Sequence, residues 1–110
     1  MKLYLDTSTP VCHLRLDETT YDWESGRDLA EGLHQFIADK LSEQHKTWSD
    51  LTEIVYFSGP GSFTGLRIGA AVVNTLADQL RIPLFDHHGE QHAVIIPDYG
   101  RPARITPPKK

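Results

Sequence analysis

Cysteine is almost absent from this chain of 110 residues: Cys12 is the single one, so no internal disulfide can form. A disulfide framework is thereby excluded, and a reducing compartment, the cytoplasm, is the expected location. Long hydrophobic runs are absent too, and none approaches the roughly 18–20 apolar residues of a membrane span. The first ten residues, MKLYLDTSTP, lack the apolar core and cleavage site of a signal peptide. We therefore expect one small domain without a membrane segment.

Positive charge is also scarce, with 11 Lys and Arg against 15 Asp and Glu and a formal net charge of −4. This balance excludes a protein that binds nucleic acid through its whole surface, because such binding needs clustered cations. Four cations and one acid lie in residues 97–110, which gives that stretch +3 and leaves −7 for residues 1–96. We predict a domain at 1–96 and a basic, proline-rich tail at 97–110. The cations of the tail are Arg101, Arg104, Lys109 and Lys110.

Hydrophobic periodicity predicts an α/β fold with five strands and two helices. The expected strands are 2–6, 11–16, 19–23, 54–57 and 83–86, and the expected helices are 25–44 and from 62–65 to 80, with a helical turn at 47–51. The order strand-strand-strand-helix-strand-helix-strand predicts an antiparallel meander followed by two crossovers in one mixed five-stranded sheet. Such a sheet is typical of a single ribonuclease-H-like lobe.

Two boundaries depend on local signals. Residues 25–28, SGRD, have the spacing of a capping box, which predicts that the first helix begins at Ser25. Residues 93–96, AVII, are compatible with a further strand, whereas the prolines from Pro97 onward oppose regular structure in the rest of the chain.

The stretch SGPGSFTGLRIG, residues 58–69, lies between a predicted strand and the second helix. A Walker phosphate loop is excluded, because Leu66 follows Gly65 where that loop needs a lysine. A dinucleotide-binding loop stays open as an alternative: residues 59–65 read G-x-G-x-x-x-G, and Asp86 ends the next strand 21 residues after Gly65. Against this alternative, Pro60 and Phe63 place a stiff and a bulky group where a pyrophosphate must approach the backbone.

A third interpretation assigns these glycines to packing. Gly59 and Gly61 permit a tight turn, and Gly65 and Gly69, four residues apart, leave room for another backbone beside the helix. The helix that follows has an apolar stripe wider than one sheet face needs, so either another element or a partner covers the excess. We expect a partner. The predicted interface residues are Leu66, Ile68, Gly69, Val72, Val73 and Leu76 on this helix, with Leu33 and Phe36 on the first helix.

Two motifs carry a resemblance to a known family. Residues 5–9 read LDTST, and residues 59–69 read GPGSFTGLRIG about 50 residues later. In both motifs the sequence resembles the TsaB (YeaZ) family. The residues that match the family pattern are Asp6, Thr7, Ser8, Gly59, Pro60, Gly61, Ser62, Phe63, Thr64, Gly65 and Arg67.

The resemblance implies an actin-like ATPase fold and a catalytically inert subunit in the synthesis of threonylcarbamoyladenosine in tRNA. It implies that the two helices bind the catalytic TsaD subunit or a second TsaB, that a TsaE-like ATPase joins the assembly, and that contact with tRNA is indirect. Family members continue into a second lobe, whereas this chain has only 24 residues after Asp86. No cofactor is therefore expected, since one lobe supplies at most half of a cleft.

Several polar residues admit two interpretations. Asp86, His87, His88, Glu90 and His92 form the richest group of donor atoms, and His88 and His92 have the i, i+4 spacing that shares a metal on a helix. Gly89 disfavours a helix there, so a solvated loop without metal is expected. The Asp6–Ser8 turn either cradles an anion or is simply hydrogen-bonded, and we expect the second. Arg67 is expected to make a specific contact, and the tail either solubilises the chain or touches tRNA phosphates.

Overall fold

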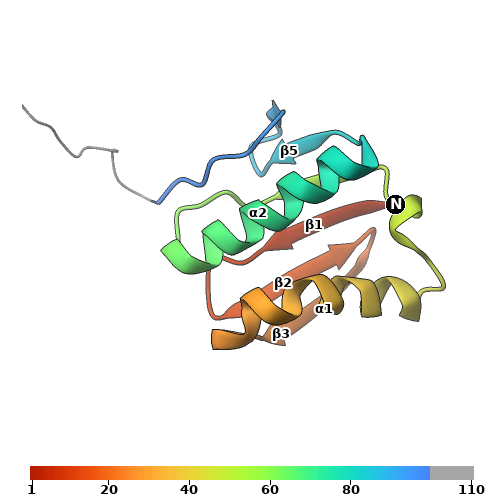
Figure 1. Cartoon of the computed structure of the whole chain (residues 1–110), viewed down its shortest axis with the longest axis horizontal. Helices are drawn as coiled ribbons and strands as arrows, with labels where there is room; N and C mark the ends of the chain where they lie inside the picture. The colour runs from red at the N-terminus through yellow and green to blue at the C-terminus, as the bar shows by residue number, and fades with distance from the viewer. Residues whose placement is uncertain (100–110) are drawn as a thin grey trace, which may run out of the picture.

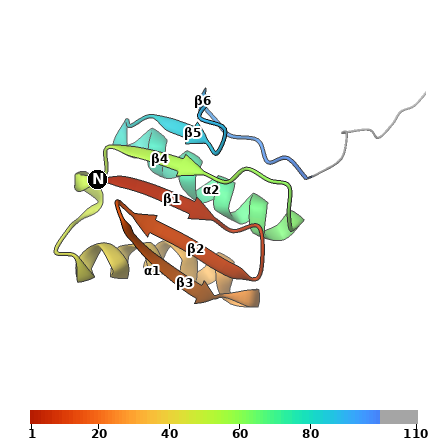
Figure 2. The same cartoon turned by 180° about the vertical axis from the view of Figure 1, so that it is seen from behind.

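The computed structural model describes residues 1–99 of the chain. Within this range six strands form one mixed sheet in the order β3-β2-β1-β4-β5-β6, and both helices lie on the same face of it (Figures 1 and 2). The predicted α/β lobe is thus confirmed. The strands are β1 (Lys2–Asp6), β2 (Val11–Leu16), β3 (Thr19–Glu24), β4 (Glu53–Tyr56), β5 (Leu84–Asp86) and β6 (Gln91–His92), and the helices are α1 (Leu29–Glu43) and α2 (Phe63–Leu80).

The sheet combines the predicted meander with two parallel crossovers. β1 pairs antiparallel with β2, and β2 pairs antiparallel with β3, whereas β1, β4 and β5 are parallel to one another. Alternate side chains of each strand point to the helices, and on β1 these are Leu3 and Leu5, which are fully buried. The core therefore lies between the sheet and the helical layer. Neither helix within residues 1–99 is long and apolar enough to cross a membrane.

The prediction of five strands is wrong by one. After β5 the Asp86 Oδ1 atom accepts hydrogen bonds from the backbone N–H groups of His88 (2.8 Å) and Glu90 (3.0 Å), and Gly89 takes a positive φ of 88°. These contacts reverse the chain and place β6 antiparallel beside β5. Residues 93–96, in contrast, form no strand, because the backbone of Ile95 pairs with the side chain of Asn74 instead of with another strand.

The second helix begins within the expected range, whereas the capping box expected at the first helix is not formed. Ser62 caps α2 as its Oγ accepts a hydrogen bond from the Gly65 N–H at 3.3 Å. Ser25 makes no cap bond, and its hydroxyl donates to the Pro10 carbonyl at 3.3 Å. A short 3₁₀ turn, η1 (Gly26–Asp28), precedes α1, which begins at Leu29. The expected turn near residue 48 is η2 (Trp48–Asp50), and its capping box is present.

Candidate functional site: the groove between the two helices

The two motif segments of the sequence pack against each other at one end of the sheet. At the end of β1, the Ser8 N–H (2.9 Å) and hydroxyl (2.6 Å) both donate to Asp6 Oδ1. The Ser62 N–H donates to the Ser8 carbonyl at 2.9 Å. A Cβ added to Gly61 would lie 2.5 Å from Ser8 Cβ, so this glycine is needed for the close approach. The hydrogen-bonded turn expected at Asp6–Ser8 is confirmed.

A buried hydroxyl pair locks α2 onto the sheet. The Thr7 hydroxyl donates to the Gly65 carbonyl at 2.7 Å, the Tyr56 hydroxyl donates to the Leu66 carbonyl at 2.7 Å, and the two hydroxyl oxygens are 2.9 Å apart. A Cβ at Gly65 would overlap the Thr7 carbonyl, and one at Gly69 would overlap the Thr7 hydroxyl. The packing interpretation of these glycines is confirmed. Burial raises the pKa of Tyr56 to about 12, which keeps its hydroxyl protonated as a donor.

This packing argues against the dinucleotide alternative. Gly59, Gly61 and Gly65 each face protein backbone or a protein side chain at the point where a ligand phosphate needs space. Asp86 is 6% exposed, and its carboxylate accepts bonds from two backbone N–H groups and from His92 Nε2 at 2.7 Å. The glycine-containing loop and Asp86 therefore make contacts that stabilise the fold.

The predicted interface residues separate into two groups. Leu33, Leu66, Gly69, Val73 and Leu76 are buried inside the monomer by the sheet and the neighbouring helix. The expectation that a partner covers these five is therefore wrong for the free chain: internal packing already covers them. Ile68, Val72 and Phe36 are only half-buried. Of these, Phe36 packs on Trp23 of the edge strand β3, with ring centroids 5.1 Å apart. Of the predicted interface residues on α2, Ile68 and Val72 therefore stay accessible.

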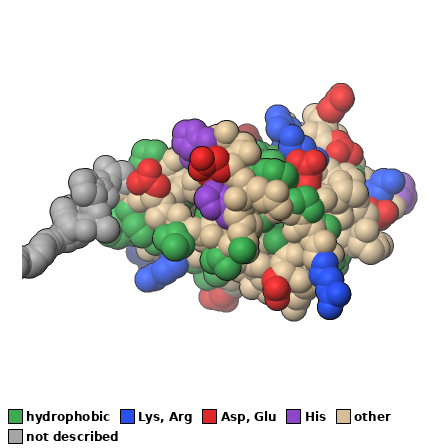
Figure 3. Space-filling view, turned by 90° about the horizontal axis from the view of Figure 1, so that it is seen from above, with side chains coloured by type: hydrophobic (Ala, Val, Ile, Leu, Met, Phe, Trp, Pro, Cys, Tyr) green, Lys and Arg blue, Asp and Glu red, His purple; other side chains and the backbone are tan. Residues whose placement is uncertain are grey.

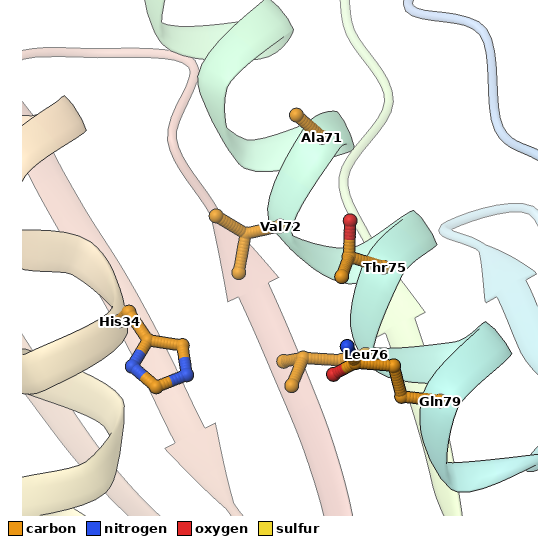
Figure 4. A pocket seen from close by; sticks show the side chains of 6 residues that line it. All are labelled: His34, Ala71, Val72, Thr75, Leu76 and Gln79. Atoms are coloured by element: carbon orange, nitrogen blue, oxygen red, sulfur yellow. The ribbon is translucent and has the colours of Figure 1, made fainter.

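A groove of about 380 Å³ lies between the two helices on their outer side. His34 reaches across from α1 towards the Val72 and Leu76 side chains of α2, as Figure 4 shows. The His34 ring stacks on Trp48 with centroids 4.8 Å apart, so η2 holds this wall of the groove in place. The floor is apolar and the rim is polar. The lining residues are His34, Ala71, Val72, Thr75, Leu76 and Gln79.

Four of these lining residues were not predicted from the sequence: His34, Ala71, Thr75 and Gln79. A signal for three of them exists, because positions 71, 75 and 79 recur at steps of four and form a row beside the apolar row at 68, 72 and 76. An uncharged row that includes the small residues Ala71 and Thr75 indicates a surface that another helix can approach. His34 has no comparable signal, since its position in the groove depends on how α1 crosses α2.

The contacts predicted for Arg67 and for the basic tail are not found among the described residues. Arg67 is exposed, and its guanidinium makes no hydrogen bond or ion pair with any part of the described chain, so the expected specific contact is not found within one copy of residues 1–99. The Asp98 N–H donates to the Ser58 carbonyl at 2.7 Å, and Tyr99 packs edge-on against Phe63 with centroids 4.3 Å apart. The four cations of the tail lie outside the described residues.

In the histidine-rich turn, the residues that come together are not the pair that the sequence spacing singled out, His88 and His92. His88 is exposed, and the atoms that gather within 4.8 Å of one another belong to Asp86, Glu90 and His92. The hydrogen bond from His92, together with the two backbone N–H groups, lowers the pKa of Asp86 to about 2. His87 stacks between Phe57 (4.4 Å) and His88 (4.0 Å). These contacts close the β5–β6 turn, which explains why the polar side chains gather there.

Known proteins resemble the chain in sequence and in fold. A family model described as TsaD, tRNA N6-adenosine threonylcarbamoyltransferase, matches residues 24–102. The TsaB protein of Escherichia coli, described as a tRNA threonylcarbamoyladenosine biosynthesis protein, is 28% identical in an alignment 92 residues long that covers 74% of this chain and 37% of that protein. A tRNA N6-adenosine threonylcarbamoyltransferase of Chromobacterium violaceum is 45% identical over 53 residues, 47% of this chain and 16% of that enzyme.

Solved structures agree with these sequence relatives. YeaZ from Pseudomonas aeruginosa superposes with a TM-score of 0.69 at 34% sequence identity, over 77% of this chain and 42% of that one. The chain thus spans less than half the length of the relatives it matches. The chain belongs to the family that the TsaD model describes, and its relatives there include TsaB (YeaZ) proteins, of which it spans roughly one lobe.

Proposed function

We propose that this chain is a non-catalytic scaffold subunit of the machinery that makes threonylcarbamoyladenosine in tRNA, and that it binds a TsaD-like catalytic subunit through the α1–α2 groove. The observation that carries the proposal is the groove itself. It exposes the half-buried Val72 above the buried Leu76, on a helix pair whose inner faces belong to the core. A concave apolar strip with a polar rim fits a helix of a partner.

The non-catalytic part of the proposal is supported by the motif geometry. Thr7, Ser8 and Tyr56 direct their hydroxyls into the protein, and Asp6 and Asp86 each accept hydrogen bonds from neighbouring groups. These groups are therefore committed to structure. Contact with tRNA would be made mainly by the partner, because residues 1–96 carry −7. The proposal includes two other partners. A second copy of the chain would compete for the same groove, and a TsaE-like ATPase would join as a third subunit.

The test is a binding measurement with matched variants. The full 110-residue chain is titrated against the TsaD-type subunit of the same genome, and its self-association is measured in parallel by analytical ultracentrifugation. Thr75→Arg places a long cation in the groove at an exposed position and is expected to weaken binding by about tenfold or more. Thr20→Arg, at an exposed position on β3, is the control and is expected to bind normally.

Three results would contradict the proposal. The wild-type chain binds no TsaD-type subunit, or Thr75→Arg and Thr20→Arg bind equally well, or the purified chain by itself transfers threonylcarbamoyl to tRNA. Self-association that Thr75→Arg abolishes, in the absence of TsaD binding, would replace the proposed partner with a second copy of the chain.

A further inference from the structure

An apolar ridge, defined as Phe63, Val94 and Ile96, lies beside α2 on the side away from α1. These are the most exposed large hydrophobic side chains of the described residues, at 55%, 61% and 81%. Phe63 begins α2, and the other two belong to the segment that follows β6. Seen from above in Figure 3, hydrophobic side chains gather at this end of the molecule. Exposed apolar side chains that cluster in this way indicate a contact surface.

The side chain of Asn74 fixes the geometry of the ridge. Its Nδ2 donates to the Ile95 carbonyl at 3.1 Å, and its Oδ1 accepts from the Ile95 N–H at 2.8 Å. Both backbone polar groups of Ile95 are therefore paired, as a neighbouring strand would pair them. The Ile95 side chain is 2% exposed and belongs to the core. Val94 and Ile96, on either side of the buried Ile95, are both exposed and therefore point outward.

The segment is held at a second point. The Asp98 N–H donates to the Ser58 carbonyl, and Gly59 has a positive φ of 125° at a position where a Cβ would overlap the Asp98 carbonyl. Residues 95 and 98 are thus both attached to the body of the lobe. The apolar side chains of the ridge are therefore carried by a fixed backbone, which lowers the entropy cost of binding a partner there.

The ridge is continuous with the groove across the surface of α2. Asn74, which holds the ridge segment, lies one turn after Ala71, which lines the groove. No charged residue occurs on α2 between Arg67 and Asp78. Depletion of charge is typical of the centre of an interface, with charged residues at the rim. The stretch of α2 between these two exposed charged residues therefore joins the groove and the ridge into one surface.

We infer that the subunit bound in the α1–α2 groove also covers the ridge, so that Val94 and Ile96 are binding residues of the same interface. This inference rests on the proposed function and extends it beyond the two helices. The partner surface that fits is apolar and wider than a single helix, since it must cover the groove and reach over α2 to the following segment.

The test uses Val94→Asp and Ile96→Asp in the full chain, with Thr20→Asp as the exposed control. Each ridge variant is expected to weaken binding of the TsaD-type subunit by about tenfold, whereas Ile96→Leu and the control bind as the wild type does. The melting temperature of each variant is expected to stay near that of the wild type, because these side chains are exposed. In the wild-type complex, amide hydrogen exchange of residues 94–96 is expected to slow on binding.

The outcomes separate the two claims. If Thr75→Arg weakens binding while both ridge variants bind normally, or exchange at 94–96 does not change, the ridge is outside the interface and the inference is overturned, but the proposed function stands. If the wild-type chain does not bind the TsaD-type subunit, both are overturned. If a ridge variant unfolds, the exchange measurement on the wild-type complex decides.

Discussion

Replacing Gly69 with alanine should destabilise this protein, although the same change stabilises most helices. At an unconstrained helix position Gly→Ala gains about 1 kcal/mol, because alanine loses less backbone entropy on folding. At position 69 the added Cβ would overlap the Thr7 hydroxyl and would lie 2.5 Å from the Tyr56 hydroxyl oxygen and 2.7 Å from a carbon of its ring. Both hydroxyls are buried and hydrogen-bonded there, so neither can turn towards water.

The magnitude follows from two costs and one gain. Moving α2 away from the sheet to accept the Cβ is an overpacking change that costs about 1–3 kcal/mol. Leaving one buried hydroxyl or carbonyl without its partner costs about 1–3 kcal/mol more. With the helix-propensity gain of about 1 kcal/mol, the expected net loss in the free energy of unfolding is about 3 kcal/mol.

The assay is urea unfolding of the full chain followed by far-UV circular dichroism, with the free energy extrapolated to water. Ala71→Gly, at an exposed position on the same helix, is the control for propensity and should lose only about 1 kcal/mol. Gly69→Ala combined with Tyr56→Phe removes one of the atoms in conflict, so the double variant should lose about 1 kcal/mol less than the sum of the singles. A Gly69→Ala protein as stable as the wild type, or more stable, would refute the reasoning.

Two further outcomes are expected. The pKa of Asp86 is lowered to about 2, so its stabilising contribution is present above its ordinary pKa of 3.8 and is lost as the pH falls from about 4 towards 2. The urea midpoint should therefore fall less steeply across this pH range in Asp86→Asn than in the wild type. Equal slopes would contradict the assignment. Burial raises the pKa of the Cys12 thiol to about 12. Near pH 8, iodoacetamide should therefore label Cys12 in the native chain about a hundredfold or more slowly than in the urea-unfolded chain. Comparable labelling rates would show that Cys12 is not in the core.

The position of Gly69 changes what its variants report. From the sequence, Gly69 belongs to the predicted interface, and a bulky replacement there would be a test of assembly. In the fold it faces Thr7 and Tyr56, so such a variant tests the stability of the monomer. Exposed positions such as Thr75 and Ile96 are better probes of binding, since a change there leaves the core intact.

The sequence by itself determined the elements and their order, because these depend on local periodicity and on a few turn residues. The buried stripe of α1, the start of α2 within residues 62–65 and the antiparallel meander of β1, β2 and β3 follow from side-chain spacing along the chain. The two motif segments also identified the family, since eleven residues in register from Gly59 to Gly69 are far more specific than a pattern of glycines.

Only the tertiary structure decided which apolar residues of α2 stay accessible on the surface. Periodicity places Leu66, Val73 and Val72 on one helix but does not say how the sheet and the neighbouring helix pack against it. That packing buries the first two and leaves Val72 half-exposed. Periodicity likewise does not say that the Asn74 side chain holds the Ile95 backbone, because a contact across 21 residues has no local signal. The sequence specifies which side chains are apolar, whereas their burial depends on how distant segments pack.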